Sequence, residues 1–224
     1  MRVVLVSSPG RSPAPHWSHA ASAELARELL AGGADVEWFH TAAIAGSPPE
    51  PVGAHARGIV AARRVALHRV GAGMHDLGLE RALADSLRQR HADAVLHVGL
   101  GAGGSPNVPW LADRMGSRVF AVVRSAEVVC QRGDLVDRTG LACTRHDDAA
   151  TCRVCCTRAW WGQPHADEFR NRWDLLLGGL LSAEAVFVEA AEVVERLAAL
   201  GVARRRLTAT HDARSIAGRV LGRG

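Results

Sequence analysis

The chain has 224 residues, and 48% of them are hydrophobic, which is enough to bury a core and excludes wholesale disorder. Its 27 basic residues, all arginine, give a net charge of +4, but they are scattered and aromatic residues are only 4%, which disfavours nucleic-acid binding. The N-terminus lacks a signal-peptide pattern, and no apolar run reaches the roughly 18 residues of a membrane span, so we expect a cytoplasmic chain without a span.

The first forty residues predict a β-α-β unit. Residues 2–6 form a β-branched apolar run that ends in Ser-Ser-Pro-Gly, as a buried strand does before a turn. Apolar residues then recur at helical spacing over 18–31, Gly32-Gly33 supplies a helix end, and 36–39 has strand character.

A second unit of the same kind follows a proline-containing loop at 41–57. It consists of a helix over 80–90, a strand over 94–98, a short helix at 110–115 and a strand over 118–123. Alternation of this kind predicts an α/β fold, namely a Rossmann-like doubly wound, mostly parallel sheet with helices on both faces.

A polar, aperiodic insertion at about 130–165 interrupts this rhythm and contains the five cysteines of the chain. Regular structure returns as a helix over 165–181, a strand over 185–188 and a helix over 189–200. We therefore predict one domain over 1–205, followed at 206–224 by a short strand and a basic tail or truncated interdomain linker.

Glycines at 99, 101 and 104 form G-x-G-x-x-G directly after a strand. Such a loop lets a pyrophosphate approach the backbone, and Arg124, at the end of the next strand, would suit the 2′-phosphate of NADP. An NADP-binding oxidoreductase is thus one hypothesis. The other interpretation is a crossover loop at the carboxyl edge of the sheet.

The cysteines are the second chemical feature. Cys152 and Cys155 form C-x-x-C, and with Cys130 and Cys143 they predict a structural zinc site that would order the insertion. His146 and Cys156 are competing ligands. Unligated thiols and a redox pair remain as alternatives.

Three histidines are also candidate site residues. His97 lies within a predicted strand, where a buried and hydrogen-bonded imidazole is expected rather than a catalytic base. His16 and His19 lie where the first strand leads into its helix, which is a usual ligand position in open α/β sheets. The alternative for this pair is the polarity of a helix start.

The order of these segments resembles the N-terminal, acceptor-side domain of family 4-like glycosyltransferases, which have the GT-B fold. The resemblance covers nearly the whole chain. It is carried by MRVVLVSSPG with the helix and strand after it, by HADAVLHVGLGAGG, by RVFAVVRSAEVVCQRGDLVDRTGLAC, by CRVCC and by LLSAEAVFVEAAEVVERLAALGV.

The resemblance implies transfer of a sugar from a nucleotide-sugar donor to an acceptor hydroxyl. The acceptor would lie at the loops after the first strand and after VLHV, and the implied acceptor-binding residues are Pro9, Gly10, His16, Gly99, Gly101 and Arg124. The C-x-x-C of this family closes the same insertion, where it is structural.

The chain departs from the family pattern at several points: Glu189 replaces a serine, Pro-Ala-Pro-His-Trp replaces a Gly-Gly acceptor loop, and two further departures bear on the reaction. Arg124 stands where the family has the histidine of a His-Asp pair, and a guanidinium cannot serve as a base, although it can bind an anion. The second GT-B domain, which binds the nucleotide-sugar, does not follow, so we expect a separate donor-binding domain as partner. The alternative is a non-catalytic binding protein derived from this fold.

Overall fold

The computed structural model describes residues 1–7, 19–41, 61–65, 69–70, 75–100, 105–123, 126–130, 135–143, 148–156 and 166–223. In this part of the chain, seven strands form one sheet in which every neighbouring pair is parallel. Their order across the sheet is β3 (Ala61–Val65), β2 (Asp35–Thr41), β1 (Arg2–Ser7), β6 (Ala94–Val98), β7 (Arg118–Val123), β8 (Ala185–Val188) and β9 (Leu207–Ala209).

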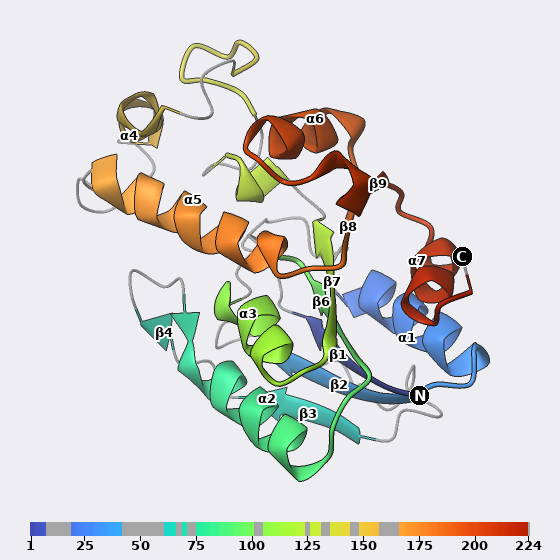
Figure 1. The fold of residues 1–224 in the computed structure, drawn as a ribbon. Helices are drawn as coiled ribbons and strands as arrows, with labels where there is room; N and C mark the ends of the chain where they lie inside the picture. The colour runs from blue at the N-terminus through green and yellow to red at the C-terminus, as the bar shows by residue number, and fades with distance from the viewer. Residues whose placement is uncertain are drawn as a thin grey trace.

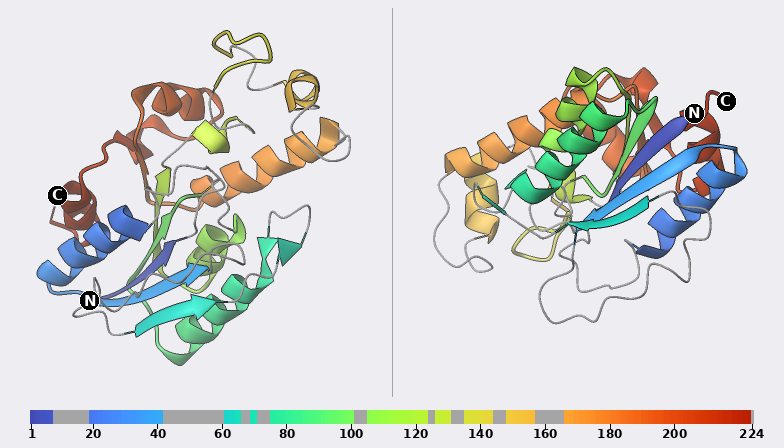
Figure 2. Two further views of the ribbon diagram at one scale, coloured as in Figure 1. Left: turned by 180° about the vertical axis from the view of Figure 1, so that it is seen from behind. Right: turned by 90° about the horizontal axis from the view of Figure 1, so that it is seen from below.

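Helices cover both faces of this sheet (Figures 1 and 2). One face packs against α2 (Leu77–Gln89), α3 (Asn107–Arg114), α5 (Ala166–Leu181) and α6 (Ala191–Ala199). The other packs against α1 (His19–Ala31) and α7 (Ala213–Val220). The predicted Rossmann-like α/β fold, with a mostly parallel sheet and helices on both faces, is therefore confirmed.

The strands form because their residues are apolar on both sides. All six residues of β1 and all five of β6 are buried, as expected for strands covered by helices on both faces. Alternate residues of a strand pack into the hydrophobic cores on opposite faces of the sheet. Val4 and Val6 pack with α2 and α3, whereas Val3 and Leu5 pack with α1 and α7.

Short elements complete the described structure. They are the antiparallel pair β4 (Arg69–Val70) and β5 (His75–Asp76), α4 (Ala149–Cys156), and the 3₁₀ turns η2 (Ala126–Val128) and η3 (Arg204–Arg206). The proline-containing loop expected at 41–57 lies outside the described residues from position 42 onward. No helix among the described residues is long and apolar enough to cross a membrane.

The C-terminal segment differs from the expected basic tail. β9 extends the sheet beside β8, and α7 packs on α1. The reason is an apolar stripe at helical spacing, formed by Ala213, Ile216, Ala217 and Val220, which are all buried. The side chain of Asp212 caps this helix by accepting a hydrogen bond from the backbone N–H of Ser215 at 2.9 Å.

The insertion also contains a helix that periodicity did not predict. α4 begins after Asp148, whose carboxylate accepts hydrogen bonds from the backbone N–H groups of Ala150 and Thr151 at 3.0 and 3.3 Å. It then packs against α5 through Cys152 and Trp173. Two helical turns are too short to show a clear repeat, so the cap and the tertiary contact decide the helix.

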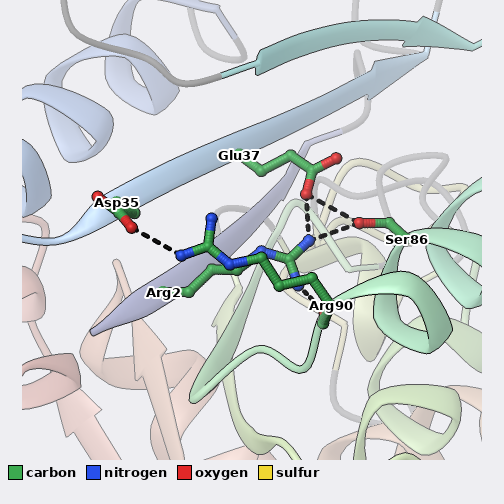
Figure 3. Close-up of polar contacts among 5 residues, drawn as sticks. All are labelled: Arg2, Asp35, Glu37, Ser86 and Arg90. Carbon is green, nitrogen blue, oxygen red and sulfur yellow. Dashed lines mark hydrogen bonds and ion pairs between the residues drawn. The ribbon is translucent and has the colours of Figure 1, made fainter.

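A buried ion pair joins three elements at the amino end of the strands (Figure 3). The guanidinium of Arg2 on β1 contacts the carboxylate of Glu37 on β2 and donates to Ser86 Oγ on α2 at 2.6 Å. Ser86 Oγ in turn donates to Glu37 Oε2 at 2.8 Å. Nearby, the exposed Arg90 pairs with Asp35 at 2.9 Å. This cluster ties the sheet to α2 at the edge opposite the candidate site.

Candidate functional site

The candidate site lies at the carboxyl edge of the sheet, between β1 and β6. The strand order reverses direction there: from β1 the chain adds β2 and β3 towards one edge of the sheet, and it then adds β6 and β7 on the other side of β1. The helix after β1 covers one face and the helix after β6 covers the opposite face. In open α/β sheets, loops that diverge in this way leave a crevice in which ligands bind.

The ends of three neighbouring strands are in register at this edge. Ser7 of β1 pairs with Val98 of β6, and Val98 pairs with Val122 of β7. The predicted acceptor loops begin directly after these strand ends. Ser7 is also fixed laterally, since its hydroxyl accepts a hydrogen bond from Trp38 Nε1 on β2 at 2.8 Å.

Gly99 is the one predicted acceptor residue that the structure describes. Its φ of 85° lies in the left-handed region, which glycine adopts without strain, and its N–H donates to the carbonyl oxygen of Val122 at 3.0 Å. The chain therefore turns out of the sheet at this glycine. Pro9, Gly10, His16, Gly101 and Arg124 lie outside the described residues, and their roles stay predictions.

A polar cluster, which we call the Glu80 cluster, consists of Glu80, Ser105 and Asn107. The carboxylate of Glu80, in the first turn of α2, accepts a hydrogen bond from the hydroxyl of Ser105. It also lies 3.3 Å from the side-chain amide nitrogen of Asn107, the first residue of α3. The cluster joins the starts of two helices that lie side by side on one face of the sheet (Figure 1).

The start of α2 is fixed by a further buried carboxylate. Asp76 is fully buried, and its Oδ1 accepts a hydrogen bond from the backbone N–H of Leu79 at 3.1 Å, which caps the helix. Sequence reasoning identified neither Asp76 nor the Glu80 cluster. Only the Asp76 cap had a sequence signal, an Asp followed four residues later by Glu80 at the start of an apolar helical pattern.

His97 is the penultimate residue of β6, one residue before the strand ends. It is fully buried, as predicted, and burial lowers the pKa of its imidazole from 6.5 to about 4. The expected hydrogen bond is not formed, because within the described structure neither Nδ1 nor Nε2 has a partner. A neutral imidazole thus lies beneath the carboxyl edge with its polar atoms uncommitted.

The four cysteines predicted to bind zinc lie in different surroundings. Cys130 belongs to the main core, whereas Cys152 packs with Trp173 under α4, and Cys143 and Cys155 are half-buried. In the residues that can be described, no three His, Cys, Asp or Glu side chains group closely enough to hold a metal ion.

The described donors thus do not assemble a metal site. His146 and the side chain of Cys156 lie outside what is described, so the zinc site stays a prediction, which metal analysis of the purified chain would decide.

Backbone and carboxylate contacts order part of this insertion instead. Val136 and Ala142 form a bridge, and the Oδ1 of Asp137 accepts hydrogen bonds from the backbone N–H and the hydroxyl of Thr139 at 2.7 and 2.6 Å. These hydrogen bonds lower the pKa of the Asp137 carboxyl. Arg196 of α6 donates to the carbonyl oxygen of Cys143 at 3.1 Å and so attaches the loop to the core.

Comparison with known proteins shows relatives by fold but not by sequence. No family model matches the chain, and no curated protein does. The structure is similar to the UDP-GlcNAc 2-epimerase of Neisseria meningitidis bound to UDP-GlcNAc, with a TM-score of 0.52 and 14% identity over 98% of this chain and 49% of that chain.

Two further solved structures give the same picture. The UDP-N-acetylglucosamine 2-epimerase of Rickettsia bellii has a TM-score of 0.50 and 12% identity over 98% of this chain and 47% of that one. Another UDP-N-acetylglucosamine 2-epimerase has a TM-score of 0.53 and 13% identity over 98% and 50%. At such identities the likeness concerns the fold alone. The chain shares a Rossmann-like α/β fold with these proteins and spans about half of their length.

Proposed function

We propose that this chain is the acceptor-side half of a GT-B-type glycosyltransferase of the family 4-like kind. It would bind an acceptor, and a separate domain would bind a nucleotide-sugar and supply the sugar to an acceptor hydroxyl. The observation that carries the proposal is the doubly wound sheet, whose strand order reverses between β1 and β6 and whose fold is shared with the structures compared above. The ordered segments that resemble the family support it.

The acceptor would be held at the carboxyl edge between β1, β6 and β7. The chain leaves β6 at this edge through the left-handed turn at Gly99. In this proposal Pro9, Gly10, His16 and Gly101 contact the acceptor from the loops after β1 and β6. Arg124 binds an anionic group of the acceptor or a phosphate, since its guanidinium holds its proton and cannot act as a base.

The donor belongs to the second domain in this proposal. The epimerases named above act on UDP-GlcNAc by their names, which makes a UDP-sugar the first donor to test. This chain supplies no covalent nucleophile in the proposed reaction. The acceptor hydroxyl attacks the anomeric carbon of the donor, the sugar–phosphate bond breaks, and the nucleoside diphosphate leaves, while the hydroxyl proton passes to the leaving diphosphate.

The experiment pairs the full chain with separately expressed donor domains, beginning with those encoded beside it. Release of nucleoside diphosphate from a UDP-sugar is followed in the presence of a panel of sugar acceptors. We expect release coupled to a glycosylated product only when both chains are present. Arg88→Gln, a surface change on the far end of α2, is the matched control and should retain full activity. Failure of every such pairing to give a product would refute the proposal.

A further inference from the structure

The side chain of His97 lies on the same face of the sheet as the Glu80 cluster. Residues of β6 alternate between faces, so His97 shares a face with Val95, which packs in the core under α2 and α3. Its register partners are Val6 on β1 and Ala121 on β7, which belong to the same core. His97 is therefore a polar residue in a row of apolar ones.

This arrangement carries an energetic cost that an apolar residue would avoid. More than about nine in ten buried polar groups in proteins have a hydrogen-bond partner, and one without a partner costs about 1–3 kcal/mol. Valine or leucine at this position would continue the apolar pattern of the strand and remove that cost. A polar side chain retained here at the expense of stability is the pattern expected at a ligand site.

The position favours a ligand role over a purely structural one. His97 is one residue from the end of its strand, at the point of the sheet where the strand order reverses and next to the turn at Gly99. Two of the helices that cover this face, α2 and α3, have the polar Glu80 cluster at their starts, beside the buried apolar residues Leu79 and Val108. Polar groups from β6, α2 and α3 thus occur on the same face of the sheet, towards its carboxyl edge.

The charge state of the imidazole limits what it can bind. Burial lowers its pKa to about 4, so the ring is neutral near pH 7 and has one N–H donor and one acceptor nitrogen. An anion without a hydrogen, such as sulfate, could satisfy only the donor, and a metal cation could satisfy only the acceptor. A hydroxyl group can meet either ring nitrogen, because it can both donate and accept, and it is the chemistry that suits this ring best.

We propose that His97 is an acceptor-binding residue whose neutral imidazole hydrogen-bonds a hydroxyl group, supplied by the sugar acceptor when it is bound and by water otherwise. This inference rests on the proposed function and deepens it, because it selects a neutral, hydroxyl-bearing part of the acceptor as the group that meets His97. Arg124 would then meet any anionic part.

The first test uses the full chain with ¹⁵N-labelled histidine. Long-range ¹H–¹⁵N spectra report the tautomer and hydrogen bonding of each ring, and the His97→Gln variant assigns the resonance. Glucose and N-acetylglucosamine are the probes, and sulfate, which has no hydroxyl group near pH 7, is the anion control. We expect the His97 nitrogens to shift with the sugars and not with sulfate. Resonances that respond to neither sugar would show a water-only or structural role and would overturn the inference.

The second test measures binding of the same two sugars to variants. His97→Leu keeps the volume but removes both polar atoms, and should weaken binding about three- to tenfold, as expected for one lost hydrogen bond. His97→Gln keeps a donor and an acceptor and should recover part of the affinity. Ser117→Ala is the matched control and should bind as the unmodified chain does, because Ser117 is another buried side chain without a hydrogen-bond partner in the described structure but lies at the opposite, amino end of the strands, just before β7.

The two proposals can fail separately. Sugar transfer at an unchanged rate and acceptor KM in His97→Leu, when paired with the donor domain, would remove His97 from the acceptor site and leave the proposed function intact. Absence of transfer with every donor domain would refute the function, while the spectra would still decide whether His97 bonds a sugar hydroxyl.

Discussion

Acid should destabilise the folded chain through His97. The imidazole is neutral in the folded state down to about pH 4, whereas in the unfolded chain it takes up a proton near pH 6.5. Below pH 6.5 the unfolded state therefore binds more protons than the folded state, and stability must fall as the pH falls. The contribution is complete above pH 6.5 and is lost progressively as the pH approaches about 4.

The structure sets the size of this effect. The folded and unfolded pKa values, about 4 and 6.5, correspond to about 3 kcal/mol when one pH unit is worth about 1.4 kcal/mol. That is a large share of the roughly 5–15 kcal/mol by which a typical domain is stable. Carboxylates titrate in the same range, so the difference between two variants isolates the histidine.

The assay is urea unfolding of the unmodified chain and of His97→Leu at a series of pH values between 4 and 7.5. Between pH 7.5 and pH 4, the free energy of unfolding of the unmodified chain should fall by about 3 kcal/mol more than that of His97→Leu. Ser117→Ala, which changes another buried side chain that has no titratable group, is the matched control and should keep the unmodified pH dependence. Parallel curves for the unmodified chain and His97→Leu would refute the reasoning.

Three further predictions test the packing. Glu37→Gln leaves the buried charge of Arg2 unpaired and should lower the free energy of urea unfolding by about 3–5 kcal/mol. Asp85→Asn, which breaks an exposed ion pair, should lower it by less than about 1 kcal/mol. Similar losses in the two variants would contradict the role given to burial. Gly179→Ala places a methyl group 2.8 Å from a backbone oxygen at the start of α3 and should lower the thermal midpoint; an unchanged midpoint would show that α5 can shift freely. Ile216→Ala should cost about 2–5 kcal/mol in a single unfolding transition; an early transition of α7 alone would contradict its place in the core.

The sequence predicted the elements whose burial is continuous. The runs at 2–6, 94–98, 118–123 and 185–188 are apolar on both sides, so they identify buried parallel strands without any knowledge of their neighbours. Gly99 was also predictable as a loop start, because a glycine directly after such a strand marks the point where the backbone leaves the sheet.

Contacts between distant residues were the part that the sequence did not predict. Glu80 meets Ser105 and Asn107 only because α2 and α3 pack side by side, and a carboxylate in a first helical turn carries no sign of its partners. The helix α4 depends in the same way on the contact between Cys152 and Trp173. The cysteine spacing drew attention to a metal, yet in the described residues Cys130 and Cys152 belong to separate hydrophobic clusters.

His97 shows why the missing information matters for function. A histidine in the sequence VLHV is expected to be buried. A hydrogen-bond partner is then also expected, because most buried polar atoms have one. The fold confirms the first half and contradicts the second among the described residues. The neighbouring side chains of Val6, Val95 and Ala121 have no polar atoms. The imidazole of His97 therefore places a hydrogen-bond donor and an acceptor in a position where they lower the stability of the fold. A discrepancy between a reliable expectation and the packed structure, located where an open α/β sheet binds its ligands, is stronger evidence for a site than any of the motifs in this chain.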